Sequence, residues 1–328
     1  MILIIVSSIF LIKGAFFEKK TKEAIFEEII TKLPKSEKGK FIKRTSFIQS
    51  SKSEISQFII SFYDENQNGF KIKKDSTVSL EATYYGIEAL HNLKSLNVIT
   101  NSQTLFDKIR SYYISPDYYL EKNKDPIFST KQALRIDRWY QEDLNQKIDL
   151  DWLKSNSIEN KNLELEKFNP EYQLAVVQIY QHLEQLEVSE KLRKIEEISY
   201  PYFDYYCNFQ FPEEISDSDY LKIKYYQISL ISNLSGVTNI VNSTASCFKE
   251  ENIKINKERL NKFNYEKLDD IKEVYWLYYL QSFYNLDPDL NQIFDKVQNF
   301  YFEGGFKEKL SDEAPSLIGT YYGTLFIK

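Results

Sequence analysis

Apolar residues recur at helical spacing through most of the chain after about residue 53. The segment 290–302 shows this clearly, because its apolar residues share one helical face: Leu290, Ile293, Phe294, Val297 and Phe300. The segment Val274–Leu280 is instead apolar on all sides, and a helix that is apolar all round is buried all round. This alternation between one-faced and fully apolar helices predicts two layers, with the one-faced helices outside and the buried helices inside.

Six helix pairs follow from this pattern, each with an amphipathic helix before a more aromatic one. The predicted pairs are 54–63 with 79–96, 104–114 with 129–144, 150–158 with 170–186, 189–200 with 218–234, 253–263 with 265–286, and 290–302 with 316–327. The sequence therefore predicts an all-α domain of about six helical hairpins over residues 53–328.

The first and last pairs carry the same motif. A Gly-Phe-Lys turn precedes a Ser-Leu-x-x-Thr-Tyr-Tyr-Gly helix start, once within residues 69–86 and once within residues 305–323. The two motif threonines, Thr83 and Thr320, lie 237 residues apart, which is about five steps of ~47 residues. Such a period is expected of stacked two-helix units.

The N-terminus has a different pattern. Ile2–Ile12 is an uncharged apolar run, and it is much shorter than the ~20 residues that a membrane-spanning helix needs. A secretory signal fits this length best. We therefore expect a signal peptide or short anchor in residues 1–17, a helix and basic linker in residues 18–52, and then the helical domain.

Two glycosylation sequons agree with export in a eukaryote. They begin at Asn233 and Asn242. We expect the protein in the secretory pathway lumen or outside the cell, anchored to the membrane if the N-terminal segment is not cleaved. The only two cysteines, Cys207 and Cys247, either pair in that compartment or are simply buried.

Charge and composition narrow the class of partner. The net charge is −6 and the isoelectric point is near 5.3, so the clustered excess of Lys and Arg that nucleic-acid binding needs is missing. The 25 Tyr and 23 Phe residues provide large, stiff rings suited to helix packing or to a lined cavity. Protein partners or a hydrophobic ligand are the expected partners.

The helical hairpins with Gly-Phe turns and Ser-Leu-x-x-Thr-Tyr-Tyr helices resemble the α/α toroid of prenyltransferase and squalene-cyclase repeats. That family includes protein prenyltransferase β subunits, terpene cyclases and non-catalytic relatives, and the lumenal toroid of ribophorin II is similar. The resemblance implies a barrel of about six outer and inner helix hairpins, in which the first and last pairs meet. Repeats of this kind identify an architecture rather than an activity.

The zinc chemistry of the prenyltransferases is not expected here. In that family a histidine ligand lies in a Gly-Gly-Phe … His-Thr-x-Tyr motif, and the matching positions in this chain are Ala82 and Gly319. A zinc site needs three protein ligands and an open position. We therefore expect no metal site and no cofactor, and we interpret His91 and His182 as surface or packing residues.

The acid of the terpene cyclases has only a partial counterpart. Those enzymes protonate an alkene with an Asp-x-Asp-Asp motif, and the nearest match is Asp217-Ser-Asp219, which lacks the last aspartate. Aspartate and serine at the start of a helix also cap free backbone N–H groups. Capping is the favoured interpretation, and a catalytic role for Asp217 and Asp219 is the alternative.

Aromatic residues at helical spacing give the candidate binding surface. Such rings are more often core than ligand-binding, but within a toroid they could line a cavity that holds an isoprenoid or stabilises cations. The candidate cavity-lining residues are Tyr84, Tyr85, Trp139, Tyr225, Tyr226, Trp276, Tyr279, Tyr321 and Tyr322.

Two functions remain open from the sequence. The favoured one is an exported, non-catalytic α/α-toroid scaffold or binding module, such as a lumenal subunit of a membrane complex. The alternative is a terpene-cyclase-like or prenyltransferase-like enzyme that acts on an isoprenoid in the central cavity. An open centre with Asp219 projecting into it would favour the enzyme, and a centre filled by aromatic rings would not.

Export is tested through the sequons. Protein made in a eukaryotic cell should lose mass on treatment with an N-glycan amidase, and replacing Asn233 and Asn242 should abolish that loss. Recovery of unglycosylated protein from the cytosol would contradict export.

Overall fold

The computed structural model describes residues 51–114, 118–140, 148–155, 170–183, 215–234 and 250–327, together with isolated positions at 47 and between 187 and 194. The chain divides into two units, Met1–Ser53 and Glu54–Lys328, and each is treated by itself. The predicted signal at 1–17, nearly all of the segment 18–52, both cysteines and Asn242 lie outside the described residues.

The second unit is mainly helical, so the predicted all-α class is confirmed. Six helices match the second members of the predicted pairs: α4 (Leu80–Asn92), α6 (Pro126–Tyr140), α8 (Pro170–His182), α10 (Asp217–Leu234), α13 (Ile271–Phe283) and α15 (Leu317–Ile327). The other α-helices with bounds are α5 (Ser102–Arg110), α7 (Leu150–Ser155), α12 (Glu250–Leu260) and α14 (Leu290–Phe300). Residues 54–60 are also helical, and short 3-10 helices lie at η1 (Leu96–Val98) and η5 (Tyr265–Lys267).

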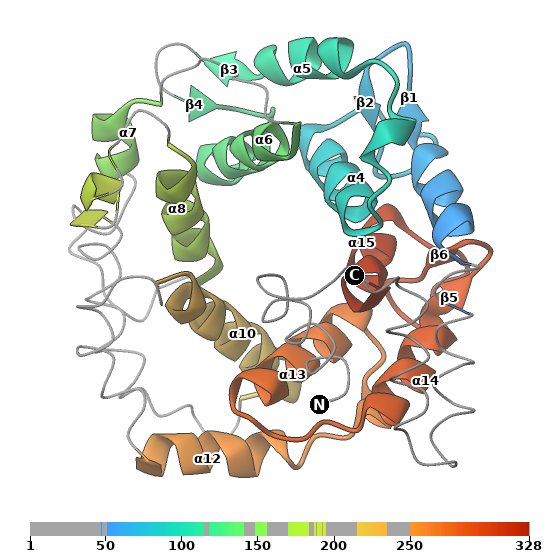
Figure 1. Ribbon diagram of the computed structural model, residues 1–328, viewed down its shortest axis with the longest axis vertical. Helices are drawn as coiled ribbons and strands as arrows, with labels where there is room; N and C mark the ends of the chain where they lie inside the picture. The colour runs from blue at the N-terminus through green and yellow to red at the C-terminus, as the bar shows by residue number, and fades with distance from the viewer. Residues whose placement is uncertain are drawn as a thin grey trace, which may run out of the picture. The chain divides into compact units, whose positions relative to one another are not determined.

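The six matching helices pack against one another in chain order. Helix α4 contacts α6, α6 contacts α8, α8 contacts α10, α10 contacts α13, and α13 contacts α15 (Figure 1). Helix α15 also contacts α4, and this is the most extensive helix pairing in the described part of the chain. The first and last copies of the sequence motif are therefore neighbours in space.

Three of the predicted first helices end earlier than expected. A tyrosine near each predicted end instead begins a two-residue strand: β1 (Tyr63–Asp64), β3 (Tyr113–Ile114) and β5 (Tyr301–Phe302). Each strand pairs with a second antiparallel strand: β2 (Gly69–Phe70), β4 (Tyr118–Tyr119) and β6 (Gly305–Phe306), respectively. The helical apolar period continued through these residues, but their side chains also suit strands, and strand pairing prevails.

A threonine in the following helix fixes each of these hairpins. The backbone N–H of a strand aromatic donates to a threonine hydroxyl, from Phe70 to Thr83 at 3.1 Å, from Tyr119 to Thr130 at 3.0 Å and from Phe306 to Thr320 at 3.0 Å. The pair at Tyr119 and Thr130 is a third copy of the motif that the sequence did not reveal. A buried N–H without an acceptor would cost ~1–3 kcal/mol, so this bond explains why the motif keeps threonine.

The motif glycines allow the strand aromatics to lie against the helices. A Cβ atom at Gly86 would come within 2.6 Å of the Phe70 ring, and one at Gly323 would come within 2.4 Å of the Phe306 ring. Real Cβ atoms do not approach other atoms so closely, because interiors are already close-packed. Both phenylalanines are fully buried, so each hairpin is packed onto its helix through a glycine.

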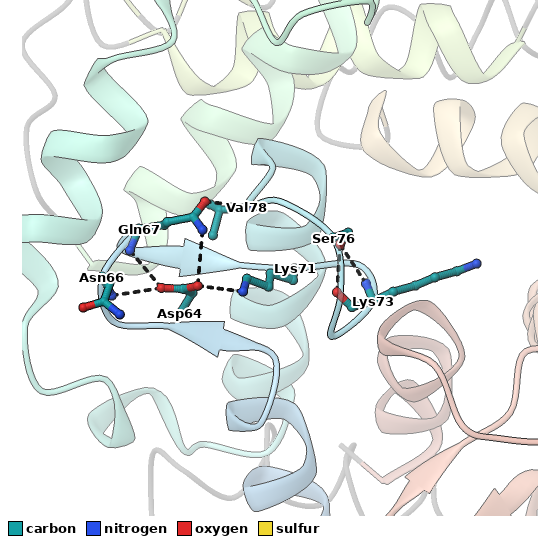
Figure 2. Close-up of polar contacts among 7 residues, drawn as sticks. All are labelled: Asp64, Asn66, Gln67, Lys71, Lys73, Ser76 and Val78. Atoms are coloured by element: carbon teal, nitrogen blue, oxygen red, sulfur yellow. Dashed lines mark hydrogen bonds and ion pairs between the residues drawn. The ribbon is translucent and has the colours of Figure 1, made fainter.

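The first hairpin also has a polar turn, which Figure 2 shows. The Asp64 carboxylate accepts hydrogen bonds from the backbone N–H groups of Asn66 and Gln67, each at 2.9 Å, and lies 2.7 Å from the Lys71 ammonium. The Lys71 hydrogen bond, with help from these N–H groups, lowers the pKa of Asp64. The segment between β2 and α4 contains a second small turn, in which the Ser76 hydroxyl donates to the Lys73 carbonyl at 2.8 Å.

Helix α4 has defined ends for reasons visible in its sequence. The Ser79 hydroxyl accepts from the Ala82 N–H at its start, as an N-cap should. At its other end Lys94 adopts a left-handed conformation with φ of 59°, and the Ser95 N–H donates to the Leu90 carbonyl at 2.9 Å. The helix therefore ends at Asn92 rather than at residue 96, as the sequence pattern had suggested.

Candidate functional site

Tyrosines of α4 and α15 meet where these two helices pack together. The ring centroid of Tyr321 lies 5.2 Å from that of Tyr85 and 6.3 Å from that of Tyr84. The neighbouring Tyr322 contacts the Tyr321 ring at 5.0 Å. Rings at such distances attract one another beyond the area that they bury.

The contacts continue from α15 to α13 and α10. Tyr322 lies 6.1 Å from Tyr275, which lies 5.8 Å from Tyr225, and Tyr225 in turn contacts Tyr226 at 5.2 Å and Tyr279 at 5.1 Å. These rings form one connected set from four helices, called here the tyrosine cluster: Tyr84, Tyr85, Tyr225, Tyr226, Tyr275, Tyr279, Tyr321 and Tyr322.

Most of the cluster is only half-buried. Tyr84 is 8% exposed, and the other seven rings have intermediate exposure. Within the described part of the chain, the hydroxyls of Tyr85, Tyr321 and Tyr322 make no hydrogen bond. Burial raises the pKa of all three, so each stays a neutral donor at physiological pH.

A charged group whose hydrogen bonds are satisfied, the Glu88 carboxylate, lies between α4 and α6. The Glu88 carboxylate is 5% exposed and accepts from Arg135 Nε at 2.8 Å and from Trp139 Nε1. The Arg135 guanidinium lies 4.7 Å from the Trp139 ring centroid, and the His91 ring stacks on Trp139 at 3.5 Å. Trp139 therefore lies against this ion pair rather than within the tyrosine cluster, and His91 is a packing residue.

One turn before Arg135, Lys131 is placed very differently. Its ammonium lies 4.7 Å from the centroid of the Tyr84 ring, and among the described residues no carboxylate lies within ion-pair distance of it. Burial lowers the pKa of Lys131 to about 8, although the charges of Glu88 and Glu171 act in the opposite direction. Lys131 is thus a half-buried cation beside the tyrosine cluster.

Asp217 and Asp219, the candidate acids, lie at the start of α10 and are exposed. The Ser216 hydroxyl donates to the Asp219 carboxylate at 2.6 Å and accepts from the Asp219 N–H at 3.1 Å. This is the geometry of a helix cap. The carboxylate of Asp219 is engaged at the helix end, in contact with solvent.

The two positions that align with the prenyltransferase histidine have packing roles. A Cβ atom at Gly319 would lie 2.5 Å from the Phe306 carbonyl oxygen, so no side chain fits there without moving β6. Ala82 is fully buried. Among the residues that the structure describes, no group of three or more His, Cys, Asp and Glu side chains could hold a metal ion.

Two remaining candidates lie at the edge of the cluster. Trp276 is 6% exposed and contacts Tyr225 and Tyr226 from the core side, at 6.0 and 6.3 Å. The Tyr279 hydroxyl donates to Ser232 Oγ at 3.1 Å. Asn233 lies in α10, but its side chain is outside the described set.

Sequence reasoning missed Tyr275 and Lys131. Tyr275 lies one turn before Tyr279, a residue already noted, so i, i+4 spacing would have found it. Lysine on a helix normally indicates a solvated face, and nothing local marks Lys131 as buried.

Comparison with known proteins does not assign the chain to a family. No protein-family model matches the chain, and no curated protein matches it. In the part of the chain that the structure describes, no helix has both the length and the apolar character needed to cross a membrane.

Replacing Lys131 tests its burial directly. Its pKa falls from 10.5 in the unfolded chain to about 8 in the fold, so the unfolded state holds the proton more tightly, and wild-type stability should rise with pH between these values. Lys131→Met removes the buried charge. We expect the variant to be more stable than wild type by about 1 kcal/mol near neutral pH, and this gain should shrink as the pH approaches 10.5.

The measurement is chemical unfolding over that pH range, with Lys307→Met as the matched control. Lys307 also lies over a ring, 4.9 Å from the centroid of the exposed Phe302. A Lys131→Met variant less stable than wild type at neutral pH would contradict the assignment.

Proposed function

We propose that residues 54–328 form a non-catalytic α/α toroid that binds an apolar ligand against the tyrosine cluster. Three features support the toroid. The inner helices contact one another in chain order, α15 returns to α4, and three hairpins repeat the same bond from a strand N–H to a helix threonine. Repeated units of this kind bury a continuous core by stacking on their neighbours.

The half-buried tyrosine cluster is the observation that carries the binding function. Its rings offer apolar area that is not fully packed away, and the hydroxyls of Tyr85, Tyr321 and Tyr322 make no hydrogen bond within the described residues. Ligand sites in proteins combine apolar and aromatic walls with a few polar groups that orient the ligand. A core built only for stability would bury the rings and pair the hydroxyls.

Binding is favoured over catalysis by two local arrangements. Asp219, the nearest match to a cyclase acid, is exposed and engaged with Ser216 at a helix start. Gly319, the nearest match to a zinc-binding histidine position, has no room for a side chain. The positions that match catalytic or metal-binding residues of the resembled enzymes therefore have other roles here: Asp219 caps a helix and Gly319 allows close packing.

We also propose that the protein is exported and serves in the secretory pathway or outside the cell. The support is the apolar run at residues 2–12 and the two sequons at Asn233 and Asn242. In that setting a protein scaffold in a membrane complex could use the same inner surface to hold a lipid or an apolar segment of its partner.

Titration with phenylnaphthylamine, a neutral aromatic probe that fluoresces in apolar surroundings, tests the binding function. Wild-type protein should bind it saturably with one site per chain. Tyr85→Ser should weaken binding about tenfold, because a lost ring contact of ~1.4 kcal/mol is a factor of ten. Phe302→Ser, which removes an exposed ring that is 41% accessible on β5, should leave affinity unchanged.

Two results would contradict this proposal. Absence of saturable binding, or equal losses in the two variants, would show that the tyrosine cluster is not the binding surface. Turnover of a prenyl diphosphate or of squalene that Asp219→Asn abolishes would show instead that the protein is an enzyme.

A further inference from the structure

The charges beside the tyrosine cluster do not balance. Glu88 and Arg135 form a buried ion pair and cancel each other, with their nitrogen and oxygen 2.8 Å apart. Glu171 lies 3.8 Å from Lys222 and hydrogen bonds with the Tyr226 side chain. Lys131 is left with a positive charge that none of these groups neutralises at close range.

The surroundings of Lys131 do not replace its lost water well. The Tyr84 ring at 4.7 Å gives a cation–π contact, which is worth ~0.5–2 kcal/mol. Taking an ammonium out of water costs more than one such contact returns, unless a charged or polar partner is also present. The fold therefore holds a cation in a place where an anion would stabilise it.

On the basis of the proposed function, we propose that the ligand is a carboxylic acid with an apolar body. Its carboxylate pairs with the Lys131 ammonium, and its body lies against the tyrosine cluster. The two positions are adjacent, because the Tyr84 ring contacts both the Lys131 ammonium and the rings of Tyr85 and Tyr321.

A single negative charge fits this position better than a double one. Lys131 offers one uncompensated positive charge, and Glu88 and Glu171 are close enough to raise its pKa by their field. A second charge on the ligand would be buried without a partner. The neutral hydroxyls of Tyr85 and Tyr321 provide donors to a carboxylate, not further cations.

The test compares two probes that differ by one charge. Anilinonaphthalene sulfonate has the same ring system as phenylnaphthylamine together with one negative charge. Wild-type protein should bind the charged probe at least tenfold more tightly than the neutral one. Lys131→Met should remove this preference while keeping affinity for the neutral probe, and Lys131→Arg should retain most of it.

Lys307→Met is the matched control, because its ammonium also lies over a ring and it should leave both affinities unchanged. Displacement of the charged probe then identifies the head group. Decanoate should displace it at a lower concentration than decanol, which lacks charge, and than decyl phosphate, which carries more charge.

The outcomes separate this inference from the proposed function. Tight binding of the neutral probe with no preference for the charged one would overturn the carboxylate assignment and leave the binding function standing. Failure of both probes to bind would overturn both proposals. Equal loss of the charged-probe preference in Lys131→Met and Lys307→Met, or stronger displacement by decyl phosphate than by decanoate, would also overturn the assignment.

Discussion

The packing of α4 against α15 is the contact on which the described helices depend. It joins side chains 232 positions apart, where Asn92 Nδ2 donates to Thr324 Oγ1 at 3.1 Å. Asn92 is 3% exposed and Thr324 is fully buried, so the Asn92 amide would be costly to leave without this acceptor. The same contact brings Tyr84 and Tyr85 to Tyr321. Without it Tyr84 and Tyr85 would be separated from the rest of the tyrosine cluster.

Helices α4 and α6 show two ways of treating a buried charge. The Glu88 carboxylate accepts hydrogen bonds from Arg135 and Trp139, and this network fixes the geometry of α4 on α6. Lys131, one turn before Arg135 in α6, has an aromatic ring and no carboxylate within ion-pair distance in the described residues. Natural proteins tolerate such unfavourable burial mainly where function needs it. Lys131, unlike the paired Glu88, therefore gives the edge of the tyrosine cluster a positive charge that is available to a ligand.

The sequence predicted the parts of the fold that local chemistry decides. The start of α4 within the Ser-Leu-x-x-Thr-Tyr-Tyr-Gly motif and the apolar faces of α4 and α14 follow from residue type and spacing. It could not predict that Tyr63, Tyr113 and Tyr301 leave their helices for short strands, because the helical period runs through them and only pairing across the turn decides. The copy of the motif at Thr130 was hidden because Tyr119 replaces the phenylalanine and no Gly-Phe turn precedes it. Lys131 was missed because its burial comes from other helices.

The most direct test of this account is a cross-link between α4 and α15. The chain with Cys207 and Cys247 replaced by serine would carry Asn92→Cys and Thr324→Cys together. The native side chains at these positions contact each other through a hydrogen bond of 3.1 Å, and a disulfide needs Cβ atoms ~3.5–4.5 Å apart, so the two thiols can pair only where the helices keep this contact. Mild oxidation should link the two peptides within one chain, as mass spectrometry of a digest would show, while each single variant stays unlinked. Two reactive thiols that never pair within the folded chain would contradict the contact between its first and last repeats.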